Sequence, residues 1–139
     1  MSYTIDDLKP GMSAEFTKTV SERDITLFGE VSGDTNPVHF DEAFAATTPF
    51  KGRIAHGVLT ASYISTVLGM DMPGPGTIFL ALNVRFKAPV RIGDAVTAVC
   101  TVRDVISDKR RVVFDCRCKV GETIVMEGDA TVMPPARKA

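Results

Sequence analysis

Asp34 and His39 are the residues best placed to do chemistry in this sequence. They are five positions apart, in a segment where Gly33 and Asn36-Pro37 favour a turn. A turn of this kind can aim a carboxylate and an imidazole at one water molecule, and such a pair can act as general acid and base. The alternative is that Asp34 only braces the loop and that His39 is a packed side chain.

A second candidate site lies at the start of an apolar stretch, in the segment Arg53-Ile54-Ala55-His56-Gly57. A helix that begins here presents unpaired backbone N–H groups at its positive end. Because Gly57 has no side chain, a ligand oxygen can approach its N–H, as an oxyanion hole requires. The alternative is an ordinary helix start, and for His56 we expect the structural role of bracing it.

Other kinds of site find little support. The sequence contains no Gly-x-Ser-x-Gly segment, no glycine-rich phosphate loop and no pairing of histidines that suits zinc. The three cysteines, Cys100, Cys116 and Cys118, are expected to be reduced and packed in the core. We therefore expect no metal site.

The composition is that of an ordinary folded domain, with 139 residues, 45% hydrophobic and 24% charged. A net charge of −1 argues against a nucleic-acid partner. The sequence contains neither an apolar run that could span a membrane nor the pattern of a secretory signal. We expect a cytoplasmic protein that forms one domain over residues 1–139, with a frayed tail at 134–139.

The first half of the chain must supply helices to position these candidates. Helical spacing of apolar residues, polar caps and terminal glycines predict helices at residues 21–32, 41–46 and 54–68. Ser21 and Asp41 are the expected caps of the first two, and Gly69 is expected to end the third. The third is the longest and would begin near the second candidate site.

In the second half, apolar and polar residues alternate, as in strands with one buried face. Strands are predicted at residues 78–87, 96–102, 111–120 and 124–130, with a hairpin turn at Gly121-Glu122. Consecutive strands of this kind favour antiparallel pairing, and the longest helix must bury its apolar side against the sheet. The fold class is therefore α+β, with a curved antiparallel sheet wrapped on a central helix.

Small residues recur every four positions along the longest predicted helix, at Gly57, Ala61, Ser65 and Gly69. Residues at this spacing share one helix face, so another group can approach that face closely. The spacing alone allows two interpretations. Either the face packs tightly against the sheet or a second subunit, or a ligand lies along it.

Residues 28–39, followed by Ala45, resemble the hydratase motif of the MaoC-like family, which includes (R)-specific enoyl-CoA hydratases. Residues 41–48 and the segment Ala55-His56-Gly57 are also similar, and the resemblance covers nearly the whole chain. It implies the hot-dog fold, in which an antiparallel sheet wraps a long helix. It also implies a homodimer whose two sheets join edge to edge, with an acyl-CoA thioester as the bound partner.

The resemblance further implies a reaction, the hydration of trans-2-enoyl-CoA to (R)-3-hydroxyacyl-CoA. Asp34 would act as base on the water, and His39 would hold that water and share in the proton transfer. The Gly57 N–H would bind the thioester oxygen. Ser65 would hydrogen-bond His39 or the water, and Asn36 is a further substrate-binding candidate. No cofactor is needed because hydration transfers no electrons, so coenzyme A enters only as part of the substrate.

Coenzyme A carries phosphates, so basic side chains are expected near the site. The candidates are Lys51, Arg53, Arg85, Lys87 and Arg91. Taken singly, each of them is more often an ordinary surface charge. Leu68 is the candidate boundary of the acyl pocket.

Three other functions stay open. One is a dehydratase that acts on acyl-carrier-protein substrates with the same Asp/His pair. A second is a hot-dog thioesterase, which the spacing of Asp34 and His39 disfavours because hydration needs a second proton-handling group. The third is a non-catalytic binding module, which the presence of both residues disfavours.

Overall fold

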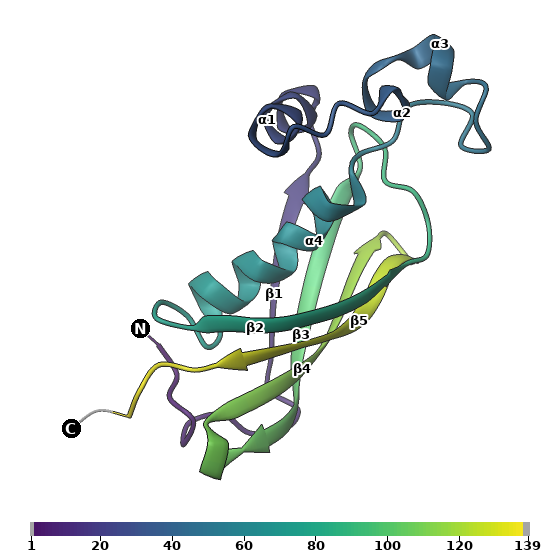
Figure 1. Ribbon diagram of the computed structural model, residues 1–139. Helices are drawn as coiled ribbons and strands as arrows, with labels where there is room; N and C mark the ends of the chain where they lie inside the picture. Colours follow the sequence, from purple (N-terminus) through teal and green to yellow (C-terminus); the bar gives the residue numbers. More distant parts are fainter. Residues whose placement is uncertain (1, 138–139) are drawn as a thin grey trace.

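The computed structural model describes residues 2–137, in which one antiparallel sheet curves around a central helix (Figure 1). The strands are β1 (Ser13–Thr19), β2 (Ile78–Phe86), β3 (Ala95–Ile106), β4 (Arg111–Val120) and β5 (Thr123–Met133). They lie in the order β1-β3-β4-β5-β2, and every neighbouring pair is antiparallel. This confirms the α+β class predicted from the sequence.

The helices fall into two groups. At one end of the molecule lie α1 (Glu22–Ser32), α2 (Pro37–Phe40) and α3 (Glu42–Ala45), close to the start of α4 (Figure 1). The central helix α4 (Gly57–Thr66) continues as a π-helical turn (Val67–Asp71), and a short 3₁₀ turn (Ser107–Lys109) joins β3 to β4. Within residues 2–137, none of the helices has both the length and the apolar character needed to cross a membrane.

Local sequence explains how α1 and α3 begin. The Ser21 side chain accepts a hydrogen bond from the Asp24 N–H, and the Asp24 carboxylate accepts one from the Ser21 N–H. The Asp41 carboxylate accepts a hydrogen bond from the Phe44 N–H and caps α3. Both predicted caps are confirmed, and Gly33 ends α1 with a φ of 79°.

The core lies between α4 and the sheet. Alternate residues of β3 and β4 are buried there: Val96, Ala98, Cys100 and Val102, and Val112, Phe114, Cys116 and Cys118. Ile64 and Val67 face them from the helical side and are almost fully buried. The cysteines are free thiols in this core, as predicted, and burial raises the pKa of Cys118 to about 12.

The central helix starts later and ends later than predicted. The Ile54 and Ala55 N–H groups donate to the carbonyls of Val38 and Val90, so both residues stay outside the helix. At the other end, the Met72 N–H donates to the Val67 carbonyl in a five-residue π-type turn. The helical conformation therefore continues past Gly69, where the sequence predicted its end.

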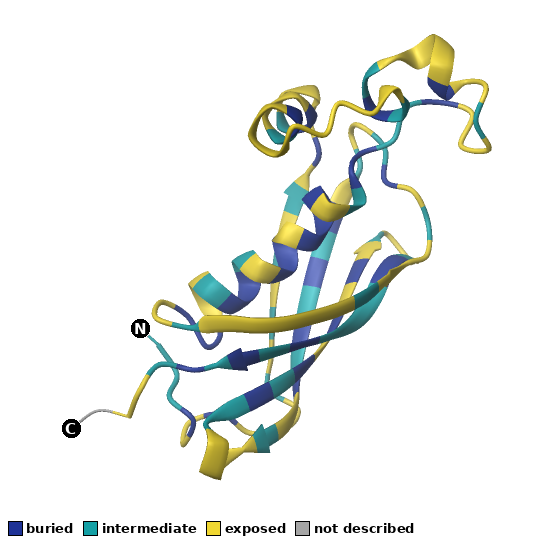
Figure 2. Ribbon diagram, in the orientation of Figure 1, coloured by how far each residue is buried: buried dark blue, intermediate teal, exposed yellow. Residues whose placement is uncertain are grey.

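Two strands also depart from the prediction. β1 was not predicted, because its alternation rests on only two apolar side chains, Ala14 and Phe16, which are only partly buried. β2 was predicted to bury one face, but it is exposed on both faces except at Val84 (Figure 2). The reason is that α4 packs mainly against β1, β3 and β4, while β2 lies at the sheet edge beside β5.

The tail makes a contact with the N-terminal segment. Arg137 Nε donates to the Asp6 carboxylate at 2.6 Å, and the fraying expected at 134–139 stays a prediction. Residues 138–139, which belonged to the same prediction, lie outside the described residues.

Candidate active site

The turn between α1 and α2 is built from side-chain contacts to its own backbone. The Asp34 carboxylate accepts a hydrogen bond from the Asn36 N–H at 3.2 Å. The Asn36 Oδ1 accepts one from the Val38 N–H at 3.1 Å, and Pro37 occupies the start of α2. The turn predicted at this segment is therefore confirmed, and it leaves the Asp34 side chain exposed at the surface.

His39 lies in α2 with its imidazole largely buried, and its hydrogen bond defines its tautomer. Nδ1 is 2.9 Å from the carbonyl oxygen of Ile54. Since a carbonyl can only accept, Nδ1 carries the proton and Nε2 keeps a free lone pair. Burial lowers the pKa of His39, outweighing the hydrogen bond to Ile54, which raises it. The ring is therefore neutral at pH 7 and can accept a proton at Nε2.

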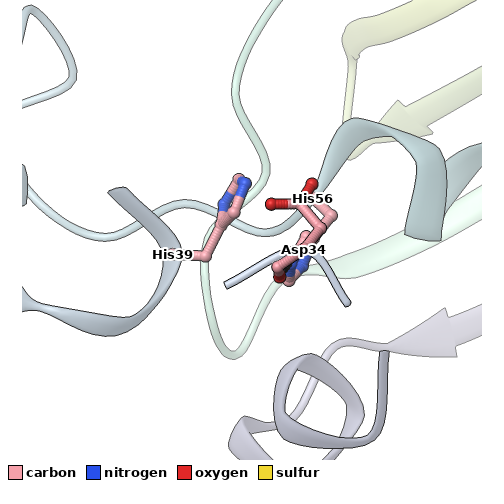
Figure 3. Close-up of side chains that lie close together, drawn as sticks. All are labelled: Asp34, His39 and His56. Atoms are coloured by element: carbon pink, nitrogen blue, oxygen red, sulfur yellow. Dashed lines mark hydrogen bonds between the residues drawn. The ribbon is translucent and has the colours of Figure 1, made fainter. Parts of the chain in front are cut away.

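Asp34, His39 and His56 come from three different segments and converge at one place (Figure 3). Their potential ligand atoms lie within 4.8 Å of one another. Two groups that hydrogen-bond the same water lie about 4–5 Å apart, so this spacing suits a shared water. Carboxylate and imidazole are also metal-ligand types, so the expected absence of a metal stays a prediction.

His56 is the residue of this cluster that sequence analysis undervalued. Its Nε2 is 2.9 Å from the backbone carbonyl of Asp34, and its ring stacks on that of His39 with centroids 3.9 Å apart. The predicted bracing of the helix start does not describe these contacts. His39 and His56 are 17 positions apart, and no motif spacing relates them. The sequence feature that could have drawn attention to His56 is its place directly before Gly57, the candidate oxyanion donor.

Arg53 ties α2 to α1. Its Nε donates to the backbone carbonyl of His39 at 2.7 Å, and its Nη2 donates to the Glu22 carboxylate at 2.8 Å. The guanidinium is already engaged within the protein, with only 16% of the side chain exposed. The structure thus shows Arg53 holding α2 against α1, and its predicted contact with coenzyme A phosphate stays a prediction.

Gly57 lies at an apolar pocket of about 370 Å³. The pocket wall includes Val58, Thr60, Phe86, Lys87, Val90 and Val125, but neither Asp34 nor His39. Gly57 is the first residue of α4, after the N-cap His56, so its N–H has no partner within the helix. A Cβ at position 57 would lie 2.7 Å from the Phe86 ring, which explains why glycine suits this position.

The remaining basic candidates lie apart from one another. Lys87 lines the pocket beside Gly57 and is 3.7 Å from the Glu127 carboxylate. Arg85 lies on β2 and lines a polar groove that also contains Arg103. Lys51 is exposed in the loop after α3, and Arg91 donates to the backbone carbonyl of Phe50. Lys87 is therefore the basic candidate that lines the pocket at Gly57.

Three further predicted residues take different places. Ser65 is exposed about 12 Å along the helix from Gly57, and among the hydrogen bonds of residues 2–137 none links it to His39. Leu68 is buried in the core and does not line the pocket at Gly57. The Asn36 oxygen caps α2, which leaves its amide nitrogen for a substrate contact. The roles of Ser65, Leu68 and Asn36 stay predictions.

The chain matches the family model described as MaoC like domain over residues 7–124. It is 54% identical over 135 residues to a protein from Rhodospirillum rubrum named (R)-specific enoyl-CoA hydratase, covering 97% of this chain and 94% of that protein. A Methylorubrum extorquens protein named 3-hydroxybutyryl-CoA dehydratase is 44% identical, with 96% and 85% covered. The unliganded R-hydratase PhaJ1 of Pseudomonas aeruginosa is 42% identical, with a TM-score of 0.91 and 98% and 88% covered. The chain therefore belongs to the MaoC-like family and has its hot-dog fold.

Proposed function

We propose that this chain is an (R)-specific hydratase that adds water to trans-2-enoyl-CoA and forms (R)-3-hydroxyacyl-CoA. The observation that carries the proposal is the Asp34–His39 pair, a carboxylate beside a neutral imidazole at a spacing that suits one water. The names of the Rhodospirillum and Pseudomonas relatives support the same reaction and stereochemistry.

The proposed reaction requires two bonds to form across one double bond. The Asp34 carboxylate takes a proton from water while the water oxygen attacks C3 of the enoyl thioester. The His39 Nε2 accepts a hydrogen bond from the same water and orients it. The electron pair of the double bond moves toward the thioester oxygen, and a proton returned by the pair then ends at C2. The product therefore contains both hydrogens of the water.

Negative charge that develops on the thioester oxygen must be stabilised by a hydrogen-bond donor. The Gly57 N–H and the positive end of α4 can supply it, since the N–H of this first helical residue has no partner within the helix. The apolar pocket at Gly57 would hold the part of the thioester next to the reacting atoms. Lys87 at this pocket is our candidate for the contact with coenzyme A phosphate.

We extend the proposal to a homodimer. β2 lies at an edge of the sheet, where its outer N–H and C=O groups have no strand partner among residues 2–137. Large apolar side chains on this strand are exposed, including Ile78 at 51% and Phe86 at 57%. Pairing of two β2 edges would satisfy the backbone groups, cover the apolar side chains and join the sheets edge to edge.

Crotonyl-CoA provides the test of the proposed function. Hydration removes the absorbance of the conjugated enoyl thioester, and a thiol reagent reports any free coenzyme A. We expect the absorbance to fall without thiol release and 3-hydroxybutyryl-CoA to accumulate. Thiol release would identify a thioesterase. Turnover only of an acyl-carrier-protein thioester would identify a carrier-protein dehydratase.

Gly57→Ala keeps the backbone N–H but crowds it, and is expected to lower kcat for hydration by up to about 10²–10³-fold, the effect of losing one oxyanion-hole donor. The added Cβ would meet the Phe86 ring at 2.7 Å and crowd the space over the N–H. Steady-state kinetics with crotonyl-CoA measure the loss. The double variant Gly57→Ala/Phe86→Ala removes the clash, so full recovery of kcat in it would show that ring displacement alone caused the defect.

The pH profile should follow the neutral state of His39. Because burial lowers the pKa of this group, the acid limb of kcat/KM is expected below pH 6.5, the ordinary histidine value. Stability has the same direction, since the unfolded chain binds a proton near pH 6.5 while the folded chain does not. His39 thus stabilises the fold above pH 6.5, and this contribution is lost as pH falls through its lowered pKa. An acid limb above 6.5, measured by initial rates, would contradict this reading.

A further inference from the structure

We propose that His56 is the positioning residue of this site, holding Asp34 by a hydrogen bond to its backbone and His39 by ring stacking. The inference rests on the proposed hydratase function for its catalytic meaning. The effect of His56 on the His39 ring can be measured without turnover.

The first contact fixes the backbone that carries the proposed base. The His56 Nε2 is 2.9 Å from the Asp34 carbonyl oxygen, so Nε2 carries the proton and donates it. The other ring nitrogen, Nδ1, is buried without a hydrogen-bond partner among residues 2–137. The bond to Asp34 is therefore the polar interaction that orients this ring. It fixes the turn at the residue whose side chain must reach the water.

The second contact fixes the plane of the His39 ring. The two imidazoles stack at 3.9 Å between centroids with an angle of 27° between planes. Nδ1 of His39 is bound to the Ile54 carbonyl, which sets the direction of the ring within that plane. Stacking and hydrogen bond together determine where Nε2 of His39 points.

His56 is itself held firmly. It is 2% exposed, and the rings of Phe28 and Phe40 lie against it with centroids at 4.8 and 5.7 Å. Its backbone is directly followed by Gly57, the proposed oxyanion donor. The positions of Asp34, His39 and the Gly57 N–H thus all depend on one buried residue, His56. A misplacement of about 1 Å at such a site can cost about 10²-fold in rate.

Two substitutions separate the two contacts. His56→Gln keeps a side-chain N–H that can reach the Asp34 carbonyl but removes the ring from beneath His39. His56→Phe keeps a ring for stacking but removes the donor. We expect each to lower kcat by about 10- to 100-fold, with KM changed by less than about threefold.

A pH titration distinguishes positioning from a merely structural role. The groups that face His39 are His56 at the start of α4, Asp34 in the turn and Arg53 at its backbone carbonyl. Burial of His39, the larger cause, and its Coulombic interaction with His56 both lower the pKa of His39. His56→Gln relieves the burial and removes the interaction, so the His39 pKa should rise toward 6.5. His56→Phe removes the interaction but keeps the His39 ring covered, so its shift should be smaller.

The chain has only two histidines, so His39 is the only imidazole left in either variant. Its proton signals can then be followed by NMR without assignment, in the full chain without added histidines. Val112→Ala is the matched control. Val112 is buried near the start of β4, whereas Cys118, near the other end of that strand, contacts α4 at Thr60. The control therefore changes the core away from the start of α4. The control should lose stability with kcat and the His39 titration unchanged.

The outcomes are separable. Equal His39 titrations in the wild type and both variants, or rates that fall only in proportion to the folded fraction, would overturn the role of His56. A wild type that shows the lowered His39 pKa and the predicted shifts but does not hydrate crotonyl-CoA would overturn the proposed function alone.

Discussion

Asp34→Asn is expected to lower kcat for hydration of crotonyl-CoA by about 10²–10⁴-fold, the usual worth of a positioned general base. An amide has the size of the carboxylate but cannot take a proton from water. Its oxygen can still accept the hydrogen bond from the Asn36 N–H, and the side chain is exposed, so the fold should be unchanged. Initial rates and thermal unfolding together measure both expectations.

Asp41→Asn is the matched control for this substitution. Asp41 lies in the same region of the chain, is also exposed, and also accepts a backbone N–H, from Phe44 at the start of α3. An asparagine at position 41 can keep that cap, so the rate should stay close to that of the wild type. Wild-type turnover in Asp34→Asn itself would show that Asp34 is not the base.

His39→Ala is expected to reduce kcat by a similar factor, about 10²–10⁴-fold. The substitution removes the Nε2 lone pair that holds the water. It also leaves the Ile54 carbonyl and one face of the His56 ring without their partner. A loss of stability is therefore expected as well, and rates must be divided by the folded fraction. His39→Gln fills more of the space and should stay slow while recovering stability.

The two residues should also act as one unit, because both contact the same water. The double variant Asp34→Asn/His39→Ala is therefore expected to be no slower than the slower single variant. Independent action would instead multiply the two losses. The same rate assay distinguishes these two results, at an enzyme concentration high enough to measure the slow double variant.

Much of the fold was predictable wherever local pattern and tertiary environment agree. β3 and β4 alternate apolar and polar residues because the sheet is covered by α4 on one face, so the pattern reports the burial directly. The turn at 34–39 and the caps Ser21 and Asp41 were predictable because they depend on side chains that bond their own backbone.

The departures arise where long-range contacts decide. β1 has little pattern of its own, and its pairing with β3 makes it a strand. Ile54 and Ala55 fit the apolar pattern of the helix that follows them. Their N–H groups, however, donate to the backbone carbonyls of Val38 and Val90, so they stay outside the helix. At the site, Asp34 and His39 follow from one short motif. The contacts of His56 and Arg53 depend on how α4 and α1 pack against α2, which no local spacing reveals.

The pocket at Gly57 is likewise formed by residues that are far apart in the sequence. Basic residues are common on surfaces, and the sequence could not rank Lys51, Arg85 and Lys87. The fold brings Lys87, directly after β2, to the pocket that Gly57 also lines at the start of α4. Leu68 lies in the π-helical turn and is buried in the core, and its place at the acyl pocket stays a prediction.

The most direct test of this account is the configuration of the product formed from crotonyl-CoA, measured by chiral analysis beside the rate for the wild type and Asp34→Asn. The account predicts (R)-3-hydroxybutyryl-CoA from the wild type and almost none from the variant. An (S) or racemic product, or equal yields from the two proteins, would contradict it.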